Sequence, residues 1–296
     1  WPLEFWVAAL NNNQSMYPPR VYVAEAQRAG VRFCLPDANR SGEEFTIDED
    51  GRGGEAIRVG LGRVEGLGPA GVRRILDERA RRPFADLGDF LARTRLGRQE
   101  ARALILCGAF DWTGRSRPTL MMELNLFFTM CPDALPAGEP LLYARPNLPN
   151  VPGDYEPRRK RLDERRILGL SVGRHVMTEL RPLWQGRVDA FSDELPQRVG
   201  RRVRLAGVLE VLRAARTERG QDMMFLTLDD ERGLFEVTVF PAALARTRAD
   251  FRRYGPYLVT GRAEDQYGAV TVAAEDVRLC DGAAEAAGAL AAATRV

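Results

Sequence analysis

The chain has 296 residues, which is enough for about two domains with hydrophobic cores of their own. Its 45% hydrophobic and 28% charged residues are typical of a globular protein, and no apolar run approaches the roughly 20 residues of a membrane span. The four cysteines are scattered without a Cys-x-x-Cys pair and there is one histidine, so the sequence disfavours a zinc cluster or a disulfide framework and favours a reducing cytoplasm. It begins at Trp1 without a methionine or a signal-peptide pattern, which predicts a fragment of a longer polypeptide.

The net charge of +2 argues neither for nor against nucleic acid as a partner, but the charge is unevenly distributed. Residues 58–102 hold 11 arginines against 6 acidic residues, and residues 155–187 hold 9 basic residues against 4 acidic ones. Each segment therefore has an excess of five positive charges. The balancing acids lie at 43–55 and toward the C-terminus, so the surface is predicted to have separate basic and acidic regions.

The first 55 residues are predicted to form two helices and a short strand. Apolar spacing predicts helices over 3–10 and 21–29, and a strand over 44–47. The acidic turn that follows the strand holds Asp48 and Asp50, a pair that could bind a metal. Because glycines follow directly, a solvated hairpin tip explains these two aspartates better.

The stretch 64–76 has the pattern of a helix-hairpin-helix, which binds nucleic-acid backbone without reading base sequence. Its two glycines form a turn in which the backbone can adopt positive φ and approach a ligand closely. Pro69 suits the first turn of the following helix, whose free N–H groups and dipole favour an anion. The competing interpretation is a glycine-rich C-cap that joins two ordinary helices. The candidate DNA contacts at this hairpin are Gly66, Leu67, Gly68, Arg73 and Arg74.

Helices predicted over 87–93, 98–106 and 117–128 continue this region, and their apolar residues, with Cys107 among them as an inert thiol, are most simply core. Part of the last helix resembles the sliding-clamp-binding pentapeptide of bacterial polymerases, which pushes a Leu-Phe pair into an apolar pocket. A glutamate stands where glutamine is usual, and the alternative is that these residues belong to the helix core. The candidate clamp-binding residues are Glu123, Leu124, Asn125, Leu126 and Phe127.

A proline-rich segment at 131–153 is predicted to be a linker and the domain boundary. A strongly basic helix is predicted over 155–168, and its excess of one sign of charge leaves phosphate contact and a solvated surface both open. His175 has no cysteine or second histidine to join it, so it is expected to pack or to form hydrogen bonds. The candidate DNA contacts on the basic helix are Arg158, Arg159, Lys160 and Arg165.

From residue 201 the apolar period changes from helical to that of strands. Strands are predicted over 203–211, 225–228, 234–240, 257–262 and 269–273. A helix over 241–251 after the third strand gives the order of an OB-fold barrel, which commonly binds single-stranded nucleic acid. Gly207 is expected to form a bulge in the first strand. The candidate contacts in the loop between the first two strands are Arg213, Arg216, Thr217 and Arg219.

Three aromatic residues of the barrel, Phe225, Phe235 and Tyr257, could stack on bases if they face outward, and the sequence does not say which of them do. The alanine-rich residues 282–296 are predicted to be a flexible tail. The sequence thus predicts an α+β multidomain protein, in which a helical region with a helix-hairpin-helix is followed by an OB-fold β-barrel.

These segments in this order resemble the C-terminal part of a bacterial family C DNA polymerase, the replicative polymerase III alpha subunit or its error-prone relatives. The resemblance covers residues 1 to about 280. It is carried by Pro-Leu-Glu-Phe at 2–5, Pro-Asp-Ala-Asn-Arg-Ser at 36–41, Gly-Leu-Gly at 60–62 and 66–68, Gly-Ala-Phe-Asp at 108–111 and Phe-Leu-Thr-Leu-Asp-Asp at 225–230.

The resemblance implies a division into functional segments. These are the end of the fingers at 1–55, a helix-hairpin-helix region at 56–130, the linker at 131–153, a basic helix and connector at 154–190, an OB-fold domain at 191–281 and the tail at 282–296. It implies that the hairpin region contacts primer-template duplex, that the pentapeptide binds the sliding clamp, and that the barrel binds single-stranded template.

The family's palm motif, Pro-Asp-x-Asp-x-Asp-Phe, and its histidine-rich phosphoesterase domain have no counterpart in this sequence. Two-metal phosphoryl transfer needs such carboxylates. The chain is therefore expected to hold no catalytic residues, metal or cofactor, the two Mg²⁺ ions belonging to the palm, and to be inactive as a nucleotidyltransferase on its own.

The leading hypothesis is a DNA-binding portion of a DNA polymerase in replication, repair or translesion synthesis. An alternative is a free-standing adaptor that recruits other replication or repair proteins. A third is an OB-bearing tRNA-binding enzyme, against which the hairpin at 66–68 and the lack of a recognisable ATP-binding motif both count. The expected partners are primer-template DNA, single-stranded template and, if the pentapeptide functions, the clamp, with no membrane.

Overall fold

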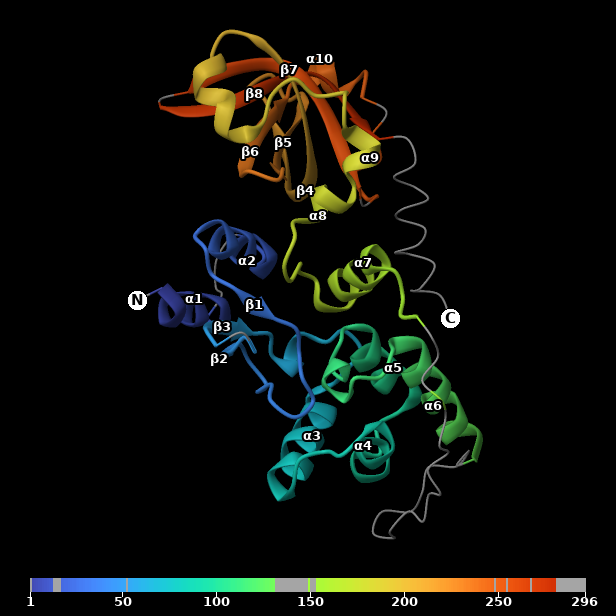
Figure 1. Ribbon diagram of the computed structural model, residues 1–296. Helices are drawn as coiled ribbons and strands as arrows, with labels where there is room; N and C mark the ends of the chain where they lie inside the picture. Colours follow the sequence, from blue (N-terminus) through green and yellow to red (C-terminus); the bar gives the residue numbers. More distant parts are fainter. Residues whose placement is uncertain are drawn as a thin grey trace. The chain divides into compact units, whose positions relative to one another are not determined.

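The computed structural model describes residues 2–12, 17–51, 53–130, 149, 153–247, 249–253, 255–266 and 268–280. The predicted tail at 282–296, and the predicted linker at 131–153 apart from residues 149 and 153, lie outside the described residues. Contacts divide the chain into two units, Trp1–Gln14 with Tyr22–Gly173, and Ser15–Val21 with Arg174–Val296. The predicted α+β class is confirmed, because a helical unit precedes a closed β-barrel (Figure 1).

The first unit begins with two helices and a small sheet. The helices are α1 (Pro2–Asn11) and α2 (Pro19–Arg28), and the strands are β1 (Phe33–Cys34), β2 (Thr46–Glu49) and β3 (Glu55–Arg58). The central strand β3 pairs in parallel with β1 and antiparallel with β2. The predicted strand at 44–47 is shifted by two residues, and β3 was not predicted because Arg58, a charged residue, is buried in it through contacts with Asp48 and the Leu35 carbonyl.

Helices make up the rest of this unit and enclose one core. They are η1 (Leu61–Arg63), α3 (Pro69–Arg81), α4 (Leu87–Thr94), α5 (Arg98–Leu106), η2 (Asp111–Thr113), α6 (Arg117–Met130) and α7 (Pro157–Leu168). Phe90 lies at the centre of the core, where its ring packs edge to face with those of Phe84 and Phe110 at centroid distances of 4.9 Å. Cys107 is fully buried, and burial raises the pKa of its thiol to about 12, as expected of an inert core residue.

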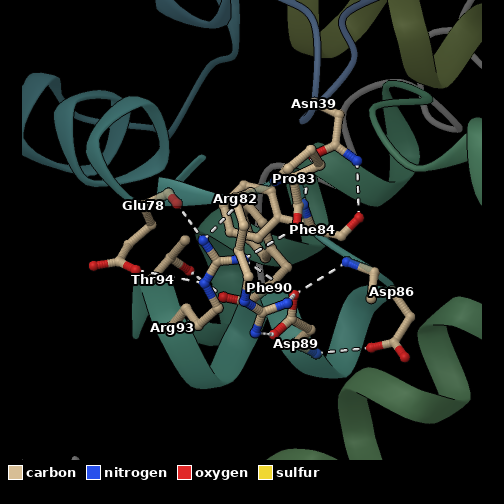
Figure 2. Close-up of polar contacts among 11 residues, drawn as sticks. Asn39, Glu78, Arg82, Pro83, Phe84, Asp86, Asp89, Phe90, Arg93 and Thr94 are labelled. Atoms are coloured by element: carbon tan, nitrogen blue, oxygen red, sulfur yellow. Dashed lines mark hydrogen bonds and ion pairs between the residues drawn. The ribbon is translucent and has the colours of Figure 1, made fainter. Parts of the chain in front are cut away.

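A network of arginines fixes the junction between α3 and α4 (Figure 2). Arg93 donates to the carbonyl of Arg82 at the end of α3 (2.9 Å) and to the carboxylate of Asp89 (3.1 Å). Its guanidinium carbon lies 4.5 Å from the ring centroid of Phe84. Arg82 in turn donates to both oxygens of Asp89, at 2.7 and 3.3 Å. The C-terminal end of α3 and helix α4 are therefore joined by hydrogen bonds in both directions.

The second unit is built on a five-stranded barrel. Before the barrel lie α8 (Val176–Glu179), α9 (Arg181–Trp184) and η3 (Ser192–Arg198), and the barrel consists of β4 (Arg202–Arg216), β5 (Asp222–Asp229), β6 (Leu234–Val239), α10 (Pro241–Leu244), β7 (Pro256–Gln266) and β8 (Ala269–Leu279). The strands close in the order β4-β5-β6-β8-β7, with β6 and β8 parallel and the other neighbours antiparallel. The barrel is OB-like, as the sequence pattern predicted.

Two details of the barrel differ from the prediction. The bulge in β4 lies between Leu209 and Val211 and not at Gly207, which instead makes room for the ring of Phe235, 2.9 Å from where a Cβ would stand. The helix predicted to run to residue 251 ends at Leu244. The carbonyls of residues 250 and 253 lie within 2.9 and 2.6 Å of the Tyr257 hydroxyl, so this segment wraps around Tyr257.

His175 packs and forms hydrogen bonds, as predicted. It is the N-cap of α8, where its Nδ1 accepts a hydrogen bond from the N–H of Met177 at 3.2 Å. Its Nε2 lies 3.1 Å from a carboxylate oxygen of the buried Asp229 on β5. The ring therefore ties the short helix to the barrel.

Candidate nucleic-acid interface

The first hairpin turn combines one buried side chain with exposed backbone. Gly66 has a φ of +86°, Leu67 is 7% exposed, and Gly68 is the extended N-cap of α3 with φ −75° and ψ 163°. Positive φ is thus used at Gly66 only, whereas both glycines were predicted to allow it. No atom lies within 4 Å of where a Cβ would stand on Gly68, so the backbone there is open to a ligand.

Three backbone donors are free at this turn. In the part of the chain that the structure describes, the N–H groups of Gly66, Gly68 and Ala70 have no hydrogen-bond acceptor, and all three residues are exposed. The first bonded amide of α3 is that of Val72, which donates to the Gly68 carbonyl at 3.0 Å. The free donors coincide with the positive end of the helix dipole, which is an arrangement that binds anions.

The helix before the turn is only the single 3-10 turn η1, and this corrects the expectation of a full helix on each side. The N–H groups of Leu61 and Gly62 donate to the carbonyls of Gly42 and Glu43, both at 2.9 Å. A Cβ on Gly62 would lie 2.9 Å from the Glu43 carbonyl oxygen. The segment before the turn is therefore packed against the chain before β2, which leaves no room for a longer helix.

The two hairpin arginines differ in their surroundings. Arg73 is exposed and has no ion-pair or hydrogen-bond partner among the described residues. Arg74 is also exposed, but its Nη1 lies 3.3 and 3.4 Å from the carbonyls of Thr94 and Arg95 at the end of α4. Arg73 is consequently free for phosphate, whereas Arg74 connects α3 with the next interhelical turn.

That next turn, residues 95–97, repeats the backbone of the first. Arg95 has a φ of +50°, Leu96 is 2% exposed, and Gly97 is the extended N-cap of α5 with φ −66° and ψ 158°. Both leucines lie against Gly71, where a Cβ would stand 2.8 Å from Leu67 and 3.1 Å from Leu96. The two turns therefore lie side by side on one core.

The equivalence extends into the helices that follow the turns. Val72 and Ala101 are buried at the same position of α3 and α5, and Arg73 and Arg102 follow them. Arg102, like Arg73, has no ion-pair or hydrogen-bond partner within the described ranges. Sequence reasoning missed this second turn because an arginine occupies its left-handed position. The available signal was a Leu-Gly pair before a helix, repeated after 29 residues.

The two turns differ in their free N–H groups, since the N–H of Arg95 donates to the Leu91 carbonyl at 3.0 Å whereas that of Gly66 is free among the described residues. The carboxylate of Glu100 accepts the N–H of Gly97 at 2.8 Å at the start of α5, which is the half of a capping box that a glycine N-cap permits. At the first turn the same position of α3 is occupied by Gly71, which brings no carboxylate. The Glu100 carboxylate lies beside Gly71 as well, with its Oε1 3.0 Å from where a Cβ would stand, but the N–H that it accepts belongs to the second turn.

The basic helix α7 is less available than its sequence indicates. Arg165 is only 9% exposed and donates to the Ser171 hydroxyl at 3.0 Å, which disfavours the predicted DNA contact by this residue. Lys160 pairs with Asp154 at 2.7 Å. Arg158 and Arg159 are exposed, and Arg159 lies 3.7 Å over the ring centroid of Tyr155. DNA contact by this helix remains a prediction for its two exposed arginines.

The inner side of α7 is held by a buried ion pair. Arg117, which is 1% exposed, lies 2.7 Å from Glu164 of α7 and 2.8 Å from Asp111. Burial raises the pKa of Glu164, although the charge of Arg117 opposes this shift. These contacts fix α7 to the helical core, so its inward residues are structural.

The pentapeptide 123–127 lies inside α6. Leu124 is fully buried and Phe127 is 6% exposed, both in the core of the first unit. Glu123 pairs with Arg115 at 2.8 Å. In this conformation the apolar side chains are not available to a partner, which agrees with the alternative of a helix core, and clamp binding remains a prediction.

Two of the four candidate residues near the end of β4 lie in the strand itself. Arg213 and Arg216 belong to β4, and only Thr217 and Arg219 stand in the turn that joins it to β5. All three arginines are exposed, and Arg216 pairs with Asp222 at 3.3 Å. Arg213 and Arg216 lie in the strand and not in the predicted loop because β4 extends to residue 216, whereas the prediction ended it at 211.

The structure resolves which barrel aromatics face outward. Phe235 and Tyr257 are 3% and 1% exposed and fill the interior. Phe225 is 44% exposed on the outer face of β5, directly opposite Arg213 of β4.

Neither a metal site nor a membrane span is found in the described ranges. There, no three histidine, cysteine, aspartate or glutamate side chains are grouped so that they could hold a metal ion, and none of the helices has the length and apolar character needed to cross a bilayer. Asp48, considered above as a metal ligand, pairs with Arg40 and Arg58, and Asp50 pairs with Arg32.

Comparison with known proteins gives two kinds of match. A family model described as a helix-hairpin-helix motif matches residues 30–120. The error-prone DNA polymerase of Burkholderia mallei is 33% identical over 257 residues, which are 83% of this chain and 22% of that protein. The enzyme of the same name from Mycolicibacterium paratuberculosis is 32% identical over 276 residues, 90% of this chain and 24% of that protein. The chain thus spans about a quarter of the length of these relatives.

Among solved structures, asparaginyl-tRNA synthetase from Pyrococcus horikoshii, complexed with asparaginyl-adenylate, matches 30% of this chain and 21% of its own. The sequence identity is 19% and the TM-score is 0.24, which is too low to support an argument.

Proposed function

We propose that this chain, which resembles the C-terminal part of a bacterial family C DNA polymerase, is the DNA-binding part of an error-prone-type enzyme. In this proposal the helical unit holds the backbone of the primer-template duplex and the barrel holds single-stranded template. The observation that carries it is the turn 66–68, with free backbone donors at a helix N-terminus, in a chain similar to error-prone DNA polymerases over most of its length.

The first turn suits a phosphate of the DNA backbone. Backbone N–H groups and a helix dipole bind a phosphate oxygen without reference to the base, and an exposed arginine one helical turn further adds a positive charge. Gly66, Gly68 and Ala70 supply the donors, and Arg73 supplies the charge. Such contacts position the protein on a duplex of any sequence, as a polymerase requires.

The second turn is proposed to contact the same duplex more weakly. Its backbone repeats that of the first turn, and Arg102 repeats Arg73. However, the carboxylate of Glu100 occupies the N–H of Gly97 and repels a phosphate there. Arg102 is therefore expected to provide most of the attraction at this turn.

Polymerisation itself is proposed to depend on carboxylates outside this sequence. The palm motif expected for two-metal phosphoryl transfer is absent from these 296 residues. The competing hypothesis, a free-standing adaptor, would also bind DNA, so the test below addresses the DNA contacts that either role needs.

The test is fluorescence anisotropy of the 296-residue chain with a labelled blunt duplex and with a labelled single strand, each over a salt series. We expect duplex binding whose log K falls with log salt by about 0.9 for each phosphate neutralised. Gly68→Val should weaken duplex binding at least about tenfold, because its side chain would occupy the open side of the turn at a backbone geometry that valine tolerates. Arg73→Ala should lower the salt slope by about one phosphate.

A matched control is Arg81→Ala, since Arg81 lies at the far end of α3, is exposed and pairs only locally with Glu78. It removes the same charge from the same helix and should change duplex affinity less than twofold. If Gly68→Val and Arg73→Ala bind duplex as well as this control does, the hairpin is not a duplex contact and the proposal fails.

A further inference from the structure

The outer face of the barrel carries a row of side chains that combines a ring with a positive charge. In the strand register Arg213 of β4 stands opposite Phe225 of β5, which stands opposite Thr238 of β6. Directly opposed residues have Cβ atoms about 4.5–5.5 Å apart and point to the same face. The ring of Phe225 therefore lies between a guanidinium and a small hydroxyl side chain.

Two exposed rings lie on this face. Phe225 is 44% exposed, and Phe240, which follows β6 in extended conformation two residues after Thr238, is 42% exposed. Strand alternation puts Phe240 on the same side of β6 as Thr238, diagonally next to Phe225. By contrast, Phe235 and Tyr257 fill the barrel core. Both residues leave more than two fifths of their surface exposed, and the faces of their rings suit planar, apolar partners.

The charges around the two rings indicate on which side of them an anionic ligand would lie. Arg213 has no ion-pair or hydrogen-bond partner in the described part of the chain, whereas Arg216 is partly neutralised by Asp222. On the opposite side Glu236 of β6 is exposed, two residues before Thr238 and on the same face. An anionic backbone is thus attracted to the β4 side of the rings and repelled from the β6 side.

We propose that Phe225 and Phe240 stack on two successive unpaired bases of single-stranded DNA, while Arg213 binds a phosphate of the same stretch. This inference rests on the proposed function of the barrel and names the residues that would carry it. A stacking platform accepts every base, because each has a π-face, so the site would hold a template of any sequence.

The test separates contacts to bases from contacts to the backbone. Anisotropy is measured for a labelled oligothymidylate and for an abasic strand of the same length. Phe225→Ala should weaken oligothymidylate binding about 5- to 100-fold and abasic binding less than twofold. Arg213→Ala should weaken both ligands and lower the salt slope by about 0.7. Phe240→Ala should act as Phe225→Ala does, with a smaller effect because its ring lies at the edge of the face.

The matched control is Val199→Ala, which shortens another exposed apolar side chain, 43% exposed, just before the start of β4 and at the opposite end of that strand from Arg213. Circular dichroism and thermal unfolding verify that each variant folds. If Phe225→Ala binds oligothymidylate like Val199→Ala, the stacking inference is wrong while the proposed function stands. If the unmodified chain binds duplex but neither single strand, the barrel's proposed role fails as well.

Discussion

The two turns of the helical unit share a backbone and differ in charge. Turns 66–68 and 95–97 each place a residue of positive φ before a buried leucine and an N-cap glycine. The first has free N–H groups, whereas the second has one of its N–H groups bound to Glu100. The comparison shows that two turns with the same backbone shape leave different numbers of N–H groups for a ligand, because the Leu91 carbonyl and the Glu100 carboxylate each accept one at the second turn.

The largest effect on stability is expected from a variant that removes Arg93 from the arginine network between α3 and α4. Arg93 connects the ends of α3 and α4 through hydrogen bonds to Asp89 and to carbonyl groups, and its side chain is 13% exposed (Figure 2). Arg93→Ala should lower the free energy of unfolding by about 3 kcal/mol, because it leaves the carbonyl of Arg82 without this donor and removes one of the donors to the buried Asp89. Urea unfolding measures this, and Arg81→Ala, at the exposed end of α3, should cost less than about 0.5 kcal/mol. Equal values for the two variants would contradict the role of the network.

The next effect tests whether the turns share their backbone conformation in solution. Gly66→Ala should destabilise the chain by about 1–2 kcal/mol, since a Cβ is unfavourable at positive φ. Arg95→Gly places glycine at the equivalent position and should change stability by less than about 0.5 kcal/mol. Urea unfolding of both variants is the measurement. A stabilising Gly66→Ala would mean that this turn does not hold the left-handed conformation.

A smaller effect is expected from pH, through the carboxylate of Asp89 at the junction between α3 and α4. Burial alone would raise the pKa of Asp89, but hydrogen bonds from the Ala85 N–H, Arg93 and Arg82 outweigh burial and hold this pKa below its usual value. A lowered pKa in the folded state contributes stability above the unfolded value of about 3.9, and this contribution is lost as the pH falls through the folded pKa.

Asp89→Asn should therefore lower the free energy of unfolding by about 1 kcal/mol at pH 7 and reduce its decline below pH 4. Urea titrations between pH 7 and pH 2 compare the two proteins. If the variant declines as steeply as the unmodified chain, other carboxylates cause the acid sensitivity.

Much of this architecture follows from periodicity in the sequence. Helical spacing of apolar residues gave α4, α5 and α6 to within two residues, and the change to strand spacing gave the barrel. Local patterns succeed here because each element buries one face in its own unit. Local sequence also predicted the first turn, because its two glycines indicate a turn directly.

The rest depends on contacts between residues that are distant in sequence or on rare backbone states. The first hairpin helix is shortened because Gly62 packs on the Glu43 carbonyl, and Arg165 is drawn inward to Ser171. The second turn was not recognised, because Arg95 adopts a conformation that sequence patterns assign to glycine. The outward position of Phe225 required the strand register.

The smallest expected effect is a gain of binding at the second turn. Glu100→Gln keeps the hydrogen bond, because the amide oxygen of glutamine also accepts the Gly97 N–H, but it removes the negative charge. If a duplex phosphate approaches this turn, affinity should rise about two- to fivefold, as for a charge near a helix N-terminus. Asp77→Asn removes the same charge from an exposed position on α3, about 13 Å along the helix from its N-cap, and controls for net charge. Anisotropy with a blunt duplex at low salt compares them. An effect of Glu100→Gln no greater than that of Asp77→Asn would mean that no duplex phosphate approaches the Glu100 carboxylate.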